Sequence, residues 1–273
     1  MLTLENVSYR YAGGLRPSLR GVSMTLHDGE IVGVVGPSEA GKSTLCLVAA
    51  GLAPRTVGGS LTGRLLLDGA ESQPLAMHEM AARVGIGFEN PTTQLSGVTS
   101  SVYEEVAFGP MNLGVARGEV LARTEAALQT LHIEDLSERD PARLSGGQQQ
   151  LVAIAGLLAM ASAHLVLDEP TAQLDPAGTR LVSAAIRRLA QSGRSILIAE
   201  HKTDLLNAVC DRVVALDAGR IALEGTTDAV LTDPRLRELG VAEPSAIRLR
   251  RLAAEAGLGS DWLDRALAGS GTS

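Results

Sequence analysis

Aromatic side chains are scarce in this sequence, since one Trp, three Tyr and two Phe make up only 2% of its 273 residues. Proteins that read single-stranded nucleic acid stack the bases on aromatic side chains, so this class of protein is not expected. The formal net charge of −7 also argues against a basic surface that follows phosphate backbones. The composition therefore predicts no nucleic-acid partner.

Cysteines and long apolar segments are also few. Cys46 and Cys210 have no metal-ligand or redox spacing, which favours a reduced, cytoplasmic setting. The longest apolar stretch, residues 151–167, is interrupted by polar side chains and runs into Asp168, so it is slightly short for a membrane span. The first ten residues contain Glu5 and do not resemble a signal peptide. We expect a soluble chain that reaches a membrane only through a partner.

Apolar residues form 45% of the chain, enough for a sizeable core in one large domain with a short appendage. Apolar runs between turn signals predict an α/β fold. The expected strands are 2–11, 19–26, 31–35, 83–88, 164–167, 195–199, 212–216 and 220–223, and the expected helices are 42–52, 119–131 and 148–160. From about residue 98 to 160 the pattern is helical, which indicates a helical insertion into the α/β core. Short helices are expected beyond Gly225, and residues 269–273 are expected to fray.

A glycine-rich loop contains one of only two lysines among the 24 basic residues. The segment 36–43, GPSEAGKS, fits G-x-x-x-x-G-K-[ST] between an expected strand and an expected helix. Its backbone N–H groups would surround phosphates, Lys42 would reach the β- and γ-phosphates, and the Ser43 hydroxyl would ligate Mg²⁺. The Glu39 carboxylate is expected to face solvent, and a purely structural glycine loop is the alternative. The candidate nucleotide-binding residues are Gly36, Pro37, Ser38, Glu39, Ala40, Gly41, Lys42, Ser43 and Thr44.

Further candidate residues follow at the ends of expected elements. Asp168 ends an apolar strand and can hold Mg²⁺, while the neighbouring Glu169 can orient or deprotonate an attacking water. A Ser-Gly-Gly step at residues 145–147 precedes an apolar helix and is a second candidate anion site. His201 follows the strand 195–199, where it can hydrogen-bond a terminal phosphate. Solvated acids, an ordinary helix cap and a structural histidine are the alternatives.

Together these segments resemble the ATP-binding cassette family of ATPases. They are, in order, GPSEAGKST, LSGGQ, LVLDEP, AQLD at residues 172–175, and His201. The resemblance covers residues 2–225. It implies a P-loop NTPase core with a parallel sheet, an N-terminal antiparallel β subdomain and an inserted α-helical subdomain at about 98–160. It also implies an ATPase domain at 1–225 and a short helical extension at 226–273.

The resemblance implies a role for each candidate residue. Tyr11 would stack on adenine, with Tyr9 on the same strand face less favoured and more typical of a core residue. Lys42, Glu169 and His201 would be catalytic, with ATP and Mg²⁺ bound. Two cassettes would dimerise head to tail, and Asp175 would cross their interface. The segment that contacts the ATP of the other subunit would be Leu144, Ser145, Gly146, Gly147 and Gln148.

A narrower resemblance is to the ATPase subunits of energy-coupling-factor transporters. It rests on FENPTTQL at residues 88–95 and on VYEEVAFGP at residues 102–110. It implies a peripheral ATPase on the cytoplasmic face of the membrane that drives uptake of a vitamin or a transition-metal ion. Its partners would be an identical or paralogous ATPase subunit and integral membrane subunits, one of which binds the substrate. The family usually has Gln where Glu89 stands, and Glu89 is expected to ligate the metal.

Two other functions remain open from the sequence. One is a soluble cassette protein acting on ribosomes or DNA, although such proteins carry two cassettes or a long coiled coil, and this chain has one phosphate loop and no long heptad pattern. The other is a nucleotide-binding regulatory module that does not hydrolyse ATP. Glu39 and Glu89, two carboxylates beside a polyanion site, are the features that favour the second alternative.

Overall fold

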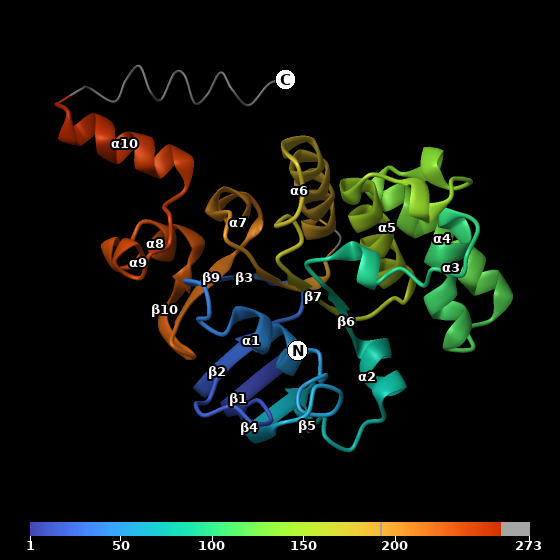
Figure 1. Cartoon of the computed structure of the whole chain (residues 1–273), viewed down its shortest axis with the longest axis horizontal. Helices are drawn as coiled ribbons and strands as arrows, with labels where there is room; N and C mark the ends of the chain where they lie inside the picture. The colour runs from blue at the N-terminus through green and yellow to red at the C-terminus, as the bar shows by residue number, and fades with distance from the viewer. Residues whose placement is uncertain (192, 258–273) are drawn as a thin grey trace.

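The central feature of the computed structural model, which describes residues 1–191 and 193–257, is a six-stranded sheet (Figure 1). Its strand order is β10-β9-β3-β8-β7-β6; five strands pair in parallel, and β10 pairs with β9 antiparallel. The strands are β3 Ile31–Val35, β6 Val84–Gly87, β7 His164–Asp168, β8 Ser195–Ala199, β9 Arg212–Asp217 and β10 Arg220–Thr226. Three of the central strands, β3, β7 and β8, are buried at every residue, because layers cover both faces of the sheet.

A second, antiparallel sheet lies below this core in Figure 1, with the order β2-β1-β4-β5. Its strands are β1 Leu2–Arg10, β2 Leu19–Leu26, β4 Ser60–Leu67 and β5 Ala70–Glu71. Helix α1, Lys42–Ala49, lies between the two sheets and buries Leu45, Cys46 and Val48 in one apolar cluster with residues of both. The start of α1 is therefore fixed by packing from two sides.

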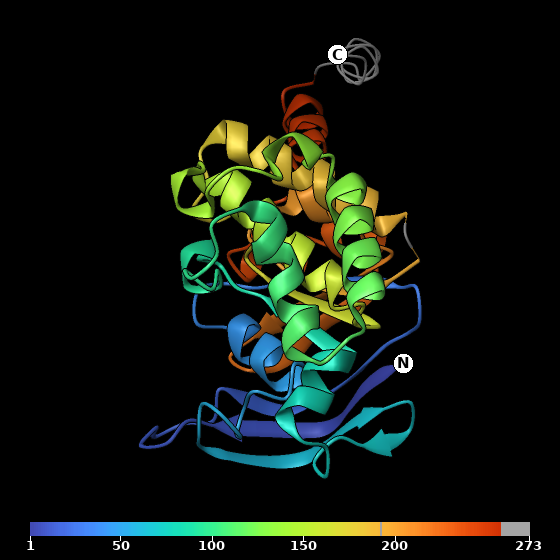
Figure 2. The same cartoon turned by 90° about the vertical axis from the view of Figure 1, so that its right-hand side faces the viewer.

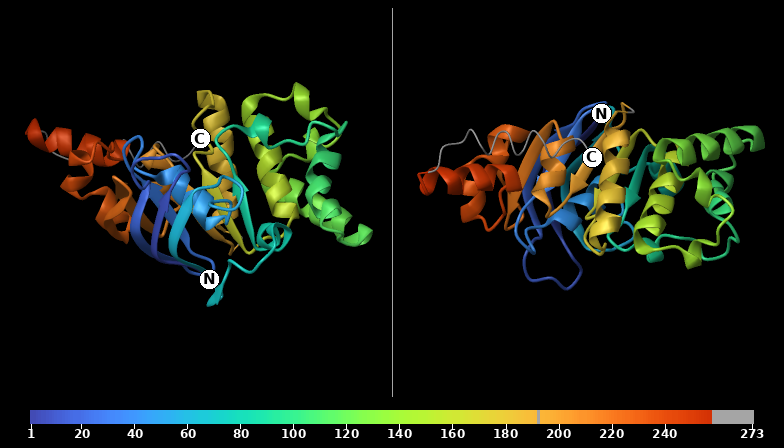
Figure 3. Two further views of the ribbon diagram at one scale, coloured as in Figure 1. Left: turned by 60° about the horizontal axis from the view of Figure 1, so that its bottom comes forward. Right: turned by 90° about the horizontal axis from the view of Figure 1, so that it is seen from above.

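The other face of the six-stranded sheet is covered by helices. α5, Gly146–Ala159, and α6, Pro176–Ala190, pack with strands β3, β7 and β8 in a second apolar cluster. α3, Val102–Asn112, and α4, Arg117–Leu131, pack beside α5 and form a helical group at one side of the molecule (Figures 2 and 3). The shorter helices are α2, Met77–Arg83, and α7, Thr203–Val209. No helix in the described part of the chain is long and apolar enough to cross a membrane.

The C-terminal segment contains the helices α8 Thr227–Leu231, α9 Pro234–Glu238 and α10 Ser245–Glu255. Figure 1 shows α10 extending away from the sheets. These helices confirm the short helices expected beyond Gly225. The expectation that residues 269–273 fray lies outside the described residues.

Most predicted elements are present, with differences at their ends. The helix expected to reach residue 52 ends at Ala49, and Gly51 then has a left-handed φ of 70° that a helix does not adopt. The strands β4 and β5 and the helices α2, α6 and α7 were not predicted. In β4 the first five residues are exposed or half-buried, so the alternation that marks a strand is present only at its end.

Candidate functional site

The glycine-rich loop connects the end of β3 to the start of α1, as its sequence predicts. Gly41 has a φ of 106°, and a Cβ atom there would lie 2.6 Å from the carbonyl oxygen of Ser18. At Gly36 a Cβ atom would lie 2.5 Å from the carbonyl oxygen of Leu216. Both glycines are therefore required by close backbone approach. Gly41 has no side-chain cap for α1, which leaves the first N–H groups of that helix available to an anion.

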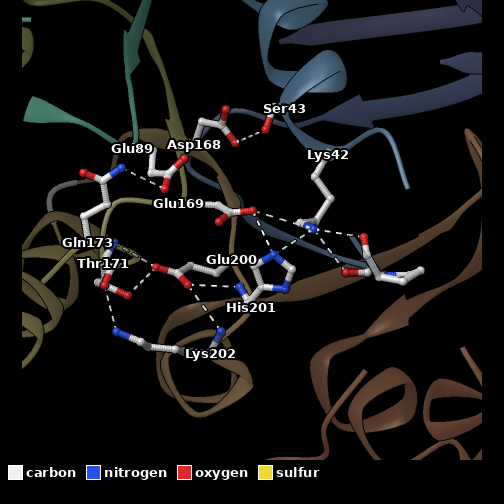
Figure 4. A network of polar contacts seen from close by, with 12 residues as sticks. Lys42, Ser43, Glu89, Asp168, Glu169, Thr171, Gln173, Glu200, His201 and Lys202 are labelled. Carbon is white, nitrogen blue, oxygen red and sulfur yellow. Dashed lines mark hydrogen bonds and ion pairs between the residues drawn. The ribbon is translucent and has the colours of Figure 1, made fainter. Parts of the chain in front are cut away.

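Lys42 is held inside this loop with only 5% of its surface exposed. Its Nζ donates to the carbonyl oxygens of Gly36 at 3.1 Å and Pro37 at 3.2 Å (Figure 4). The same Nζ lies 3.2 Å from His201 Nε2 and 3.7 Å from Glu169 Oε1. The ammonium group is thus already positioned at the loop, where phosphate oxygens can replace the two carbonyls.

Asp168 and Ser43 form an oxygen-rich pair at the end of β7. The Ser43 hydroxyl donates to Asp168 Oδ1 at 3.1 Å. Burial, together with the nearby Glu169 and Glu89 carboxylates, raises the pKa of Asp168 from 3.8 to about 6, although the Ser43 hydrogen bond and Lys42 oppose this shift. A hydroxyl and carboxylates are the hard oxygen ligands that Mg²⁺ prefers, and a divalent cation would stabilise the ionised Asp168. The residues present therefore fit a magnesium site.

Glu169 and His201 face each other beside Lys42. Glu169 Oε1 lies 3.0 Å from His201 Nε2, and both side chains border the same cavity. Glu169 has a positive φ of 48°, and its N–H donates to the carbonyl oxygen of Ala199 in β8 at 2.9 Å. This sharp turn directs its carboxylate away from that of Asp168 and toward Lys42 (Figure 4). The Glu169 carboxylate and the His201 imidazole thus both lie next to the Lys42 ammonium group.

A buried carboxylate that the motifs did not identify joins the loops that follow β7 and β8. Glu200 is 1% exposed, and its Oε1 accepts from both the N–H and the hydroxyl of Thr171. Its Oε2 accepts from the N–H groups of His201 at 3.0 Å and Lys202 at 3.3 Å. Lys202 Nζ closes the network by donating to the Thr171 carbonyl at 2.8 Å. The signals in the sequence were an acid directly after an apolar strand and the second of the two lysines.

Glu89 lies beside Asp168, on the segment that follows β6 (Figure 4). Gln173 Nε2 donates to Glu89 Oε1 at 3.1 Å, and the Glu89 side chain is exposed. Glu89 raises the pKa of Asp168, so the two carboxylates affect each other electrostatically. A divalent cation between them would relieve this repulsion, which is consistent with the predicted ligand position.

A cavity of about 720 Å³ opens at this site, a size that suits a nucleotide. The predicted residues that line it are Ser38, Glu39, Gly41, Lys42, Ser43, Thr44, Glu169 and His201. Glu39 is exposed, as expected. Arg16 and Arg20 also line the cavity and were not singled out in the sequence, since no motif marks them.

Tyr11 is not among the residues lining this cavity. Its hydroxyl lies 3.1 Å from Thr44 Oγ1, at the start of α1, and its ring meets the Tyr9 ring edge to face at 4.9 Å between centroids. Tyr9 is fully buried and donates to the carbonyl of Gly58. The structure thus places Tyr9 in the core and Tyr11 beside the phosphate loop.

The segment 144–148 does not line the cavity either. Ser145 and Gly146 are exposed, and Ser145 caps α5 through Oγ, which accepts from the N–H of Gln148 at 3.4 Å. Gly147 packs against α6, because a Cβ atom there would lie 2.7 Å from the Cα of Gly178. Asp175 caps α6 by accepting from the Gly178 N–H at 2.6 Å. The two helix starts are therefore side by side, and the Ser-Gly step faces outward.

Comparison with known proteins places this geometry in context. The sequence model of the ABC transporter family matches residues 19–172. The energy-coupling factor transporter ATP-binding protein EcfA of Methanosarcina acetivorans is 38% identical over 264 residues, covering 96% of this chain and 93% of EcfA. Among solved structures, cbiO1 from Clostridium perfringens, part of the ABC transporter complex cbiONQ, is 32% identical with a TM-score of 0.76, covering 92% of this chain and 98% of cbiO1. A dimeric ATP-binding cassette in a post-hydrolysis state bound to ADP and Pi is 25% identical with a TM-score of 0.69, covering 83% of this chain and 99% of that one.

Proposed function

Because the chain belongs to the ABC transporter family, we propose that it is the Mg²⁺-dependent, ATP-hydrolysing subunit of an importer of the energy-coupling-factor type. The observation that carries this proposal is the convergence of Lys42, Glu169 and His201 on one cavity, next to the Ser43–Asp168 pair. The 38% identity to EcfA over nearly the whole chain supports the transporter class.

In this proposal each side chain of the site has a role when ATP binds. The N–H groups of the loop at residues 36–44 and the start of α1 surround the phosphates, and Lys42 Nζ exchanges the Gly36 and Pro37 carbonyls for phosphate oxygens. Ser43, Asp168 and Glu89 would hold Mg²⁺, which would supply positive charge to offset that of the phosphates. The adenine ring stacks on Tyr11, which lies beside Thr44.

Hydrolysis then uses the Glu169–His201 pair. A γ-phosphoryl group that enters between Lys42 and His201 separates Glu169 Oε1 from His201 Nε2, which are 3.0 Å apart without nucleotide. The freed carboxylate accepts a proton from the attacking water, while the imidazole donates to the γ-phosphoryl oxygen. Glu200 holds the backbone of His201 and Thr171 together, so the imidazole and the loop that follows Glu169 keep their relative position.

A second copy completes the site. Ser145 and Gly146 at the start of α5 are exposed, so the Ser145 hydroxyl and the N–H groups of this helix start can bind a γ-phosphate held by a neighbouring chain. Asp175, on the adjacent α6, would lie at the interface of this head-to-tail dimer. ATP bound between two copies stabilises the dimer, and its hydrolysis allows the dimer to open.

The partners we propose are a second ATPase subunit, identical or paralogous, and integral membrane subunits that include a substrate-binding one. The place of cbiO1 in the complex cbiONQ supports such an assembly. In this proposal the protein is peripheral on the cytoplasmic face of the membrane and energises uptake of a vitamin or a transition-metal ion. Residues 1–225 form the ATPase domain, with the helical subdomain at about 98–160, and residues 226–273 form the extension.

Substitution of Glu169 by Gln tests the proposal. We expect Mg²⁺-dependent phosphate release, measured with the membrane subunits present, to fall about 10³-fold because the proton acceptor is lost. ATP binding remains, and ATP-bound dimers accumulate in size-exclusion chromatography with light scattering. Glu138→Gln, at an exposed position on the helical side, is the matched control and keeps wild-type turnover. Wild-type turnover by Glu169→Gln would remove Glu169 from the mechanism, and a wild-type protein that binds ATP without releasing phosphate would favour a regulatory module.

A further inference from the structure

A group of potential metal ligands lies at the end of β7 opposite to Asp168. Asp28, Asp68 and His164 each offer one ligand atom, and these atoms lie within 4.8 Å of one another. We propose that these three side chains bind one divalent transition-metal cation, with Zn²⁺ as the representative ion. This site is separate from the nucleotide cavity, whose lining includes none of the three residues.

The fold brings the three residues together from separate segments. Asp28 lies in the turn between β2 and β3, where the neighbouring Gly29 N–H donates to Ser195 Oγ at 3.0 Å. His164 begins β7 and pairs with Ser195 of β8, so it lies next to that turn. Asp68 lies in the turn between β4 and β5 of the antiparallel sheet. The cluster therefore bridges the two sheets.

His164 provides the observation that points to a ligand. The residue is 2% exposed, and its Nδ1 is buried with no hydrogen-bond partner among the described residues. An unpaired polar atom in this position is costly, so it needs either a partner or a function.

The cluster already attracts a positive group. The Met1 ammonium lies 2.5 Å from Asp28 Oδ1 and 2.7 Å from Asp68 Oδ1. This contact explains the two carboxylates, but it leaves His164 Nδ1 without a hydrogen-bond partner among the described residues. A dication balances both carboxylates and also accepts the imidazole lone pair, and in that state the Met1 group leaves its position. One nitrogen and two oxygen ligands favour Zn²⁺-like ions over Mg²⁺ and Ca²⁺, which prefer oxygen ligands alone.

Metal binding at this position would hold the two sheets together. Asp68 belongs to the antiparallel sheet, whereas His164 belongs to the six-stranded sheet. A cation that binds only the folded protein stabilises it by mass action, so at about 100 times the dissociation constant we expect the Tm to rise by roughly 5–10 °C.

Isothermal titration calorimetry and thermal unfolding of the full chain with ZnCl₂ test this proposal. We expect the wild-type protein to bind one Zn²⁺ ion tightly and to show the Tm increase given above. The Zn²⁺ affinity should fall at least tenfold in Asp68→Asn and in His164→Gln. The control His132→Gln, which replaces an exposed histidine, should bind Zn²⁺ like the wild type. Asp68 lies in an exposed turn, so its variant keeps the test valid even if His164→Gln fails to fold. Co²⁺ in place of Zn²⁺ should give visible absorption bands that His164→Gln alters.

The nucleotide site also contains carboxylates and a histidine, so Zn²⁺ binding there must be distinguished from Zn²⁺ binding at Asp28, Asp68 and His164. A Zn²⁺ equivalent that survives Asp68→Asn and His164→Gln but disappears in Asp168→Asn overturns the proposal, as does the absence of tight binding to the wild-type protein. ATP hydrolysis by Asp68→Asn is expected to equal that of the wild type. The outcome for this metal site is thus independent of the outcome for the proposed ATPase activity.

Discussion

Two helices of this molecule begin with glycine-rich sequences, and the two helix starts are built differently. The start of α1 follows a buried strand, lies between two sheets and contains the buried Lys42. The start of α5 is exposed at Ser145 and Gly146. The side chains of Asp168, Glu169 and His201 lie next to the start of α1. None of these three lies at the start of α5.

The two helix starts also differ in their caps. No side chain caps α1, so its N–H groups remain free for a ligand. In α5, Ser145 Oγ accepts from the Gln148 N–H, and Gln148 Oε1 accepts from the Ser145 N–H at 3.1 Å. The start of α5 is therefore stable without a ligand and retains its exposed hydroxyl and glycine N–H groups for a weaker contact. On the proposed function, α1 would bind nucleotide tightly within one chain, whereas α5 would contribute only when a second chain supplies the nucleotide.

Of the substitutions at the two helix starts, Lys42→Ala at the start of α1 should cause the largest change, which is a loss of ATP affinity. Loss of the positioned ammonium removes charge-assisted hydrogen bonds to two phosphates, so we expect ATP affinity to fall about 10²–10³-fold. Titration with a fluorescent ATP analogue measures this change in single chains. Arg187→Ala, an exposed basic residue on α6, is the control and should bind ATP like the wild type. Equal affinity in Lys42→Ala would mean that the α1 start is not the principal phosphate site.

Ser145→Ala, at the α5 start, should leave ATP affinity of single chains unchanged and lower turnover about tenfold or more. The hydroxyl no longer reaches the nucleotide of the neighbouring chain, although the phosphate loop remains intact. Loss of the cap also costs about 1 kcal/mol of stability. Ser101→Ala removes a cap of the same kind from α3, where Ser101 Oγ accepts from the Glu104 N–H at 3.2 Å, and should retain turnover. A fall in ATP affinity with Ser145→Ala alone would contradict the proposed division between the two helix starts.

The sequence predicted the parts of this site that depend on residues close together along the chain. The loop at residues 36–43 could be predicted because strand, glycines and helix follow one another along the chain, and the mainly parallel sheet followed from its continuous apolar strands. The Glu200–Thr171 network could not be predicted, because it requires β7 and β8 to be neighbours in the sheet. The spacing of motifs along the sequence does not determine the order of strands in a sheet. The strand β4 also escaped prediction, because its pairing with β1, rather than its own pattern, makes it a strand. The catalytic and metal-binding roles assigned from the resemblance stay predictions.

A last prediction concerns the charge buried beside α1. The pKa of Asp168 is about 6 in the folded protein, whereas an aspartate in the unfolded chain has its ordinary pKa of 3.8, so between these pH values the folded state holds a proton that the unfolded chain has released. The Asp168 contribution to the free energy of unfolding therefore falls as pH rises from about 4 to 6, and the full cost, on the order of 2–3 kcal/mol, is present above pH 7. Well below pH 3.8 the group is protonated in both states and contributes nothing.

Guanidinium unfolding of the metal-free and nucleotide-free protein at pH 4.5 and pH 7 measures this change. Other carboxylates also titrate in this range, so the difference between the wild type and Asp168→Asn isolates the contribution of Asp168. We expect Asp168→Asn to become more stable relative to the wild type as pH rises, and Ser145→Ala to shift stability equally at both pH values, since no titratable side chain lies at the capping contact. A constant difference between Asp168→Asn and the wild type would show that the α1 side holds no costly buried charge, and the electrostatic contrast between the two helix starts would then be lost.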